Sequence, residues 1–240
     1  EQPTESRLYF KKNVINNNAG MCNSENTYGD EDFQCPAIHI FRASATIYNN
    51  VVSHNLGDAL RIKGGIVNVQ NNEMQTSSFA VNISHHDTNY GDKFASIGYF
   101  SNNTFTGALQ VYNITESMVT IQSEEIPAPG GDELYPINMR WLGSECPDVQ
   151  NACLKLPETA NMPPEDMPMA LELVNNSTVL SYANLQNFDA SKIHVNNQQS
   201  AWGNQVREGE LVKFRVKASN VDVEGATVVI KDAIGTPLYN

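Results

Sequence analysis

Short stretches in which apolar and polar residues alternate recur along the first half of the chain. Four of them share one order, an alanine followed by an apolar, a polar and an apolar residue, and begin at Ala37, Ala59, Ala80 and Ala108. Their starts are 22, 21 and 28 residues apart. Because such alternation is typical of a strand with one buried face, the pattern predicts short β-strands that repeat about once every 22 residues.

A pair of asparagines lies between these strands at a similar spacing, at Asn49-Asn50, Asn71-Asn72 and Asn102-Asn103. Asparagine makes up 29 of the 240 residues and favours turns over helix interiors. A repeat of this length predicts a solenoid, since each coil is too thin to bury its own apolar residues and must stack on the next. Equivalent asparagines of successive coils are then expected to hydrogen-bond in an inward ladder, to which we assign Asn102.

These repeats resemble those of the right-handed parallel β-helix proteins of the pectate-lyase-like superfamily, over roughly residues 6–126 and again 172–197. The resemblance implies an all-β, right-handed parallel β-helix. It does not select one activity, because this fold serves polysaccharide lyases, glycoside hydrolases, phage tailspikes, adhesins and surface proteins alike.

Two later regions depart from the repeat. Residues 124–170 are rich in proline, and we expect them to leave the solenoid as an excursion over one face or end. Residues 212–217 and 226–231 alternate as strands do and resemble the opening strands of an Ig-like or carboxypeptidase-regulatory-like sandwich. We therefore expect a β-helix over residues 1–200 and the start of a sandwich-like module over 201–240, within a larger modular protein.

The net charge and the cysteines indicate which partners and which cellular location to expect. A formal charge of −12 disfavours nucleic acid as a partner, because binding to phosphates needs a basic surface. No apolar run approaches the roughly 20 residues that span a bilayer. Proximity in the sequence suggests two local disulfides, Cys22 with Cys35 and Cys146 with Cys153. Disulfides indicate an oxidising compartment, so we expect an extracellular or cell-surface location.

The polar residues of the repeated strands are candidates for binding. Alternation turns them outward, and stacking of coils is expected to align them in two rows. The first row comprises His39, Arg61, Asn82 and Gln110, and the second comprises Phe41, Lys63, Ser84 and Tyr112.

Two functions are conceivable for these rows. Phe41, Arg61, Gln110 and Tyr112 are expected to contact a glycan. The alternative is catalysis by His39, Arg61 and Lys63, since in the resembling lyases and hydrolases such a row holds substrate, and a cation can neutralise a uronate while a base abstracts a proton. A basic or aromatic residue in every coil is also ordinary on an exposed sheet, and no acidic cluster accompanies these three residues, which argues against catalysis.

Metal and modification sites are the remaining candidates. Asp30 and Asp32 lie inside the first cysteine loop and are the best pair for a structural Ca²⁺, although solvated charge is the preferred explanation of these carboxylates. His85-His86 with Asp87 is interpreted as a turn rather than a metal site. N-linked glycosylation is expected at four sequons, those of Asn82, Asn113, Asn175 and Asn176, whereas the sequon of Asn102 is assigned to the ladder.

Together these patterns predict an extracellular or cell-surface β-helix unit that is structural or glycan-contacting and not catalytic. Its expected partner is an extracellular polysaccharide or a neighbouring surface protein, and no cofactor other than structural Ca²⁺ is expected. One alternative is a polysaccharide lyase or glycoside hydrolase. Another is a subunit that self-assembles into a surface layer or filament, since a solenoid exposes strand edges at its ends.

Overall fold

The computed structural model describes most of the first 140 residues and short segments thereafter. The described residues are 7–16, 36–87, 93–131, 135–140, 153–156, 171–174, 179–182, 193–196, 205–208, 217–218, 221–222, 230–231 and 237–239. The chain separates into two compact units, Glu1–Glu210 and Leu211–Asn240. Among the described residues there is no helix, and therefore none that could cross a membrane.

Three sheets build the first unit, and neighbouring strands in all of them run parallel. The eight-stranded sheet contains, in spatial order, β1 (Arg7–Lys11), β4 (Ser44–Tyr48), β7 (Ile66–Gln70), β12 (Ile97–Ser101), β15 (Met118–Gln122), β17 (Leu154–Leu156), β19 (Val179–Tyr182) and β21 (Gln205–Glu208). The seven-stranded sheet contains β3 (Ile38–Phe41), β6 (Leu60–Lys63), β9 (Phe79–Ser84), β14 (Gln110–Thr115), β16 (Ile137–Arg140), β18 (Leu171–Val174) and β20 (Ile193–Asn196). The four-stranded sheet contains β2 (Val14–Asn16), β5 (Val51–Asn55), β8 (Glu73–Thr76) and β13 (Thr104–Thr106).

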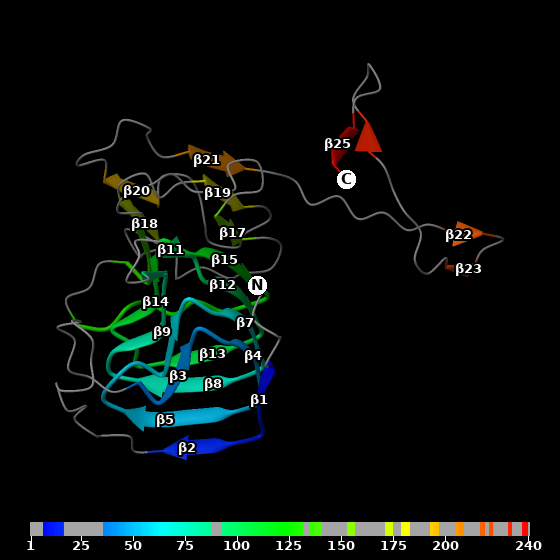
Figure 1. Ribbon diagram of the computed structural model, residues 1–240. Helices are drawn as coiled ribbons and strands as arrows, with labels where there is room; N and C mark the ends of the chain where they lie inside the picture. Colours follow the sequence, from blue (N-terminus) through cyan, green and yellow to red (C-terminus); the bar gives the residue numbers. More distant parts are fainter. Residues whose placement is uncertain are drawn as a thin grey trace. The chain divides into compact units, whose positions relative to one another are not determined.

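The chain visits the three sheets in turn, so that strands β3, β4 and β5 form one coil and β6, β7 and β8 form the next. Figure 1 shows these strands stacked on one another. Ile38 pairs with Leu60 and Leu60 with Val81, which makes the first coils 22 and 21 residues long. The prediction of an all-β chain of stacked parallel strands is confirmed, and the arrangement is consistent with a β-helix solenoid.

The core lies between the sheets and is filled by columns of equivalent side chains. In the seven-stranded sheet one column consists of Ile40, Ile62, Ile83 and Ile114, all of which are buried. Each such side chain stabilises the fold by roughly 2 kcal/mol, because its apolar surface is removed from water. No coil could obtain this stabilisation alone, which is why stacking and folding go together.

The expected asparagine ladder is present, but it uses the second residue of each pair. The Nδ2 atoms of Asn50 and Asn72 each donate to the Oδ1 atom of the next asparagine at 2.9 Å, up to Asn103. The first residues, Asn71 and Asn102 among them, instead adopt left-handed φ values of 54° and 53° and form the turn. The assignment of Asn102 to the ladder was therefore wrong, since Asn103 takes that place.

The ladder ends at a carboxylate. Asn103 Nδ2 donates to Glu124 Oε1 at 2.6 Å, and the hydroxyl of Tyr112 donates to Glu124 Oε2. Burial raises the pKa of Glu124 to about 7 despite these hydrogen bonds, which act in the opposite direction. Burial, and then the charge of Glu124, raise the pKa of Tyr112 well above its usual value. The stack of amides thus terminates in a buried, titratable acceptor.

Two predicted boundaries need correction. Residues 124–170 do not form a single excursion, because β16 and β17 lie inside this range and extend the seven-stranded and eight-stranded sheets. Short strands there are fixed by pairing with the preceding coil, despite the surrounding prolines. Strand β21 also pairs with β19, so that the solenoid continues past residue 200.

Small antiparallel pairs complete the described elements. β10 (His86–Asp87) and β11 (Lys93–Phe94) form an insertion between β9 and β12. In the second unit, β22 (Lys217–Ala218) pairs with β23 (Val221–Asp222), and β24 (Ile230–Lys231) pairs with β25 (Pro237–Tyr239). The predicted strands at 212–217 and 226–231 lie mostly outside the described residues, so the sandwich-like module stays a prediction.

Candidate functional site

The outward rows predicted on the seven-stranded sheet exist over their first three coils. His39 pairs in register with Arg61, and Arg61 with Asn82. Phe41, Lys63 and Ser84 form the parallel row in the same coils. All six residues are partly or fully accessible, as the alternation requires.

The predicted register of the fourth coil is wrong by three residues, and an odd shift turns outward positions inward. Asn113 and Thr115 continue the two rows, whereas Gln110 pairs with Phe79 and Tyr112 with Val81. Gln110 is 4% exposed and donates to the carbonyl of Tyr135 at 2.9 Å, and Tyr112 is 0% exposed. The prediction that Gln110 and Tyr112 contact a glycan was therefore wrong. The physical reason is that Tyr112 fills an inward position, where its ring lies edge-on to Phe100 and its hydroxyl reaches Glu124.

A buried carboxylate accepts hydrogen bonds from the middle residues of the first row. Asp58 is 1% exposed, and its Oδ2 atom accepts from Arg61 Nε at 2.8 Å and from Asn82 Nδ2 at 3.0 Å. Its Oδ1 atom accepts from Ser78 Oγ at 2.9 Å. Sequence reasoning missed Asp58, although Asp58 and Arg61 are only three residues apart. The pairing holds the guanidinium of Arg61 along the sheet and neutralises much of its charge.

Lys63 adds positive charge beside Arg61, and His39 lies next to Arg61 in the adjacent coil. Burial, followed by the charges of Arg61 and Lys63, lowers the pKa of His39, which leaves the imidazole neutral at pH 7. Arg61 is held by its ion pair with Asp58, which disfavours it as a base. In the part of the chain that the structure describes, no three His, Cys, Asp or Glu side chains form a metal-binding group.

A second internal pairing lies at the corner that follows β9 and β14. His85 Nε2 is 3.0 Å from Asp87 Oδ2, and His85 Nδ1 is 3.1 Å from Glu116 Oε2. Glu116 is 2% exposed and adopts a left-handed φ of 45°, which is unusual for a residue with a side chain. The contacts fit the interpretation of His85-His86-Asp87 as a turn, fastened here to the next coil by Glu116.

The outer face of the eight-stranded sheet was not considered from the sequence, and its chemistry is different. Pairing of β4, β7, β12, β15 and β17 aligns a central row along the solenoid. This central row consists of Thr46, Asn68, Tyr99, Thr120 and Lys155, and Tyr9 precedes it in β1. A flanking row consists of Tyr48, Gln70, Ser101 and Gln122.

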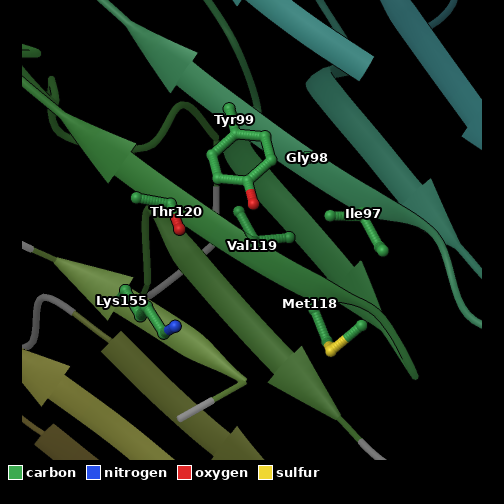
Figure 2. A pocket seen from close by; sticks show the side chains of 7 residues that line it. All are labelled: Ile97, Gly98, Tyr99, Met118, Val119, Thr120 and Lys155. Atoms are coloured by element: carbon green, nitrogen blue, oxygen red, sulfur yellow. The ribbon is translucent and has the colours of Figure 1, made fainter. Parts of the chain in front are cut away.

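Tyr99 stands between two shallow hollows of this face. One, of about 140 Å³, lies between Tyr99, Met118 and Lys155, and Figure 2 shows these side chains around it. The other, of about 210 Å³, lies among Asn68, Tyr99 and Gln122. Tyr99 is 53% exposed, so its ring is accessible from both sides. An accessible ring beside amides and hydroxyls can stack on one group while its neighbours hydrogen-bond to another.

Four amide and hydroxyl side chains of this face have no partner within the described part of the chain, although Lys11 lies over the ring of Tyr48 at its edge. Asn68, Gln70, Thr120 and Gln122 form no side-chain hydrogen bond or ion pair there, in contrast to Asp58 or Arg61 on the other sheet. Water satisfies such groups in the free protein, and a ligand with hydroxyls can replace that water without leaving a polar group unpaired.

Several predicted sites fall outside the described residues, namely Cys22, Asp30, Asp32, Cys35, Cys146, Asn175 and Asn176. Cys153 is buried and disulfide-bonded, but its partner lies outside the described residues. Its predicted pairing with Cys146, the Cys22 and Cys35 pair and the Ca²⁺ site therefore stay predictions.

No family model, no curated protein and no solved structure matches this chain.

Proposed function

We propose that this chain is an extracellular or cell-surface β-helix unit that binds a polysaccharide, without cleaving it, through the outer face of the eight-stranded sheet. The observation that carries the proposal is Tyr99, half exposed between two hollows and surrounded by amides and hydroxyls that have no partner among the described residues.

The geometry suits a long, weakly charged polymer. Successive coils present equivalent groups about every 4.8 Å, so a polymer lying along the solenoid meets a similar group again in each coil. The ring of Tyr99 offers an apolar face for the C–H side of a sugar, while Asn68 and Thr120 lie beside it in the same row to bond hydroxyls. Among the described strands, the charged residues in register with this row are Lys155 and, through Ser181, Arg207, which favours mostly neutral sugars with occasional acidic substituents.

The enzymatic alternative, with His39, Arg61 and Lys63 acting on an anionic polysaccharide, draws support from the local positive charge. The ion pair of Arg61 with Asp58 argues against catalysis, because a guanidinium held by a buried carboxylate stabilises the sheet and is less available to a substrate. The self-assembly alternative draws support from β1, β2 and β3, which end the three sheets among the described strands.

Retention and cleavage on a panel of neutral and anionic polysaccharides test the proposal. We expect the full chain to be retained on at least one neutral polymer without releasing new reducing ends or unsaturated products. Tyr99→Ala should weaken retention about tenfold, because one aromatic stacking contact contributes about 1 kcal/mol or slightly more. Phe41→Ala is the matched control, since Phe41 is similarly exposed at 49% but lies on the other sheet.

Three outcomes would contradict the proposal. Equal losses in both variants would show that the retention is not specific to the eight-stranded sheet. Cleavage that disappears in Lys63→Ala would place an active site on the seven-stranded sheet. Filaments in the absence of any retention would favour self-assembly.

A further inference from the structure

Three N-x-S/T sequons lie within the described residues, and they occupy different environments. Their asparagines are Asn82, Asn102 and Asn113. The sequence motif is the same in each case, so the difference between them is entirely structural. An N-linked glycan requires an amide nitrogen that is accessible and can be released from other hydrogen bonds without cost to the fold.

Asn82 and Asn113 are poor acceptors by this criterion. Both lie within strands of the seven-stranded sheet and are only partly accessible. Asn82 Nδ2 donates to the buried carboxylate of Asp58 at 3.0 Å, and Asn113 Nδ2 donates to Asn82 Oδ1 at 3.3 Å. A glycan replaces one of the two hydrogens of the amide nitrogen, so at either residue the sugar would have to fit beside the sheet while the remaining N–H keeps its acceptor.

Asn102 is in the opposite situation. It follows β12 in the turn toward β13, is exposed, and has a left-handed φ of 53°. Only its backbone N–H is engaged, by the carbonyl of Ser123 at 3.1 Å, and its side chain has no partner among the described residues. Thr104, the hydroxyl residue of the sequon, is also exposed, while Asn103 between them points inward to the ladder.

We propose that Asn102 is the acceptor of an N-linked glycan on this protein, and that Asn82 and Asn113 are not. The donor is a lipid-linked oligosaccharide diphosphate. The amide nitrogen of Asn102 attacks the anomeric carbon of the first sugar, a C–N bond forms as the C–O bond to the diphosphate breaks, the lipid diphosphate leaves, and the amide loses one proton. The glycan then projects from the rim of the eight-stranded sheet, beside Ser101 and Gln122.

Peptide mapping of the protein secreted from a eukaryotic host tests this inference. Treatment with a glycosidase in heavy-oxygen water converts each glycosylated asparagine into a labelled aspartate. We expect the label at Asn102 and none at Asn82 or Asn113, and Thr104→Ala should abolish it. Label at Asn82 or Asn113, or an unlabelled Asn102, would overturn the inference. This readout does not depend on glycan binding, so it can fail or succeed separately from the proposed function.

The preceding coil offers a matched gain-of-site variant. Glu73 is exposed and pairs in register with Thr104, and Asn71 has nearly the same φ as Asn102. Glu73→Thr therefore creates a sequon at Asn71 in the same turn. We expect one additional glycan at Asn71. A secreted, folded variant that gains none would overturn the claim that the geometry of this turn makes the acceptor.

Discussion

The two long sheets of the solenoid share the same coils but satisfy their outward polar groups in different ways. On the seven-stranded sheet, Asp58 binds Arg61 and Asn82, and at its corner Glu116 and Asp87 enclose His85. On the eight-stranded sheet, the amides and hydroxyls around Tyr99 have no partner among the described residues. The charged face is thus largely occupied by its own contacts, whereas the neutral face is available to a ligand.

This difference shows why charge alone is a weak guide to a binding site. The sequence drew attention to His39, Arg61 and Lys63 because the repeat turns them outward in two rows, where basic side chains could act on an anionic sugar. An exposed charge that is already paired contributes little to binding, since its partner must be displaced first. Unpaired neutral groups next to an aromatic ring are less conspicuous and more available.

The largest expected effect comes from removing the carboxylate beneath the charged face. Asp58→Ala leaves Arg61, Ser78 and Asn82 without their common acceptor, and we expect the free energy of unfolding to fall by about 3 kcal/mol or more. Chemical denaturation measures this loss. Asn68→Ala on the neutral face is the control, with an expected change within about 0.5 kcal/mol. A similar fall in the free energy of unfolding in both variants would show that the two faces do not differ in how their polar groups are paired.

A second test compares two buried carboxylates. Asp58 has a cationic partner, whereas the side-chain partners of Glu124 are the neutral Asn103 and Tyr112. The pKa of Glu124 is about 7 when folded against 4.5 as the ordinary value, so the folded protein retains a proton that the unfolded chain loses between these pH values. The stabilisation is complete below pH 4.5 and is lost as the pH rises through 7, by up to about 3 kcal/mol.

Unfolding curves from pH 4 to 8 measure this dependence. We expect Glu124→Gln to reduce it and Glu125→Gln, at the exposed neighbouring position, to leave it unchanged. A dependence that persists in Glu124→Gln would assign the titration to another group.

The smallest expected effect concerns salt. If a neutral polysaccharide binds the eight-stranded sheet, its retention should change less than about twofold between roughly 0.05 and 0.5 M salt, because screening acts on charge pairs. Column retention over a salt series measures this. A steep loss with salt would indicate that the cations of the seven-stranded sheet make the contact.

The sequence was sufficient for the architecture where the repeat is regular. From residue 37 to 83 the strands and asparagine pairs recur every 21 or 22 residues, and the register follows directly. The predicted register was wrong at β14. Ala108-Leu109-Gln110-Val111 has the same residue order as the motif, but the inward position that pairs with Val81 is occupied by Tyr112. A tyrosine is acceptable there only because Glu124 receives its hydroxyl, and that contact depends on the folded coil.

The neutral face was visible in the sequence only in part. Thr46, Tyr48, Asn68 and Gln70 lie at alternating positions next to recognised asparagine pairs. Counting back from Asn102 would have placed Tyr99 in the same row, since the turn fixes the register of the strand before it. That their side chains have no partners could not be deduced, because it depends on which coil lies next to which.

The asparagine ladder has a consequence for how such a protein can change in length. Each of Asn50, Asn72 and Asn103 accepts from one side and donates to the other, so a duplicated coil placed between them would join the column by the same two hydrogen bonds. Glu124 accepts from Asn103 but, when ionised, has no donor for a further amide. Growth or shrinkage by whole coils is therefore permitted inside the column and stops at its acidic end.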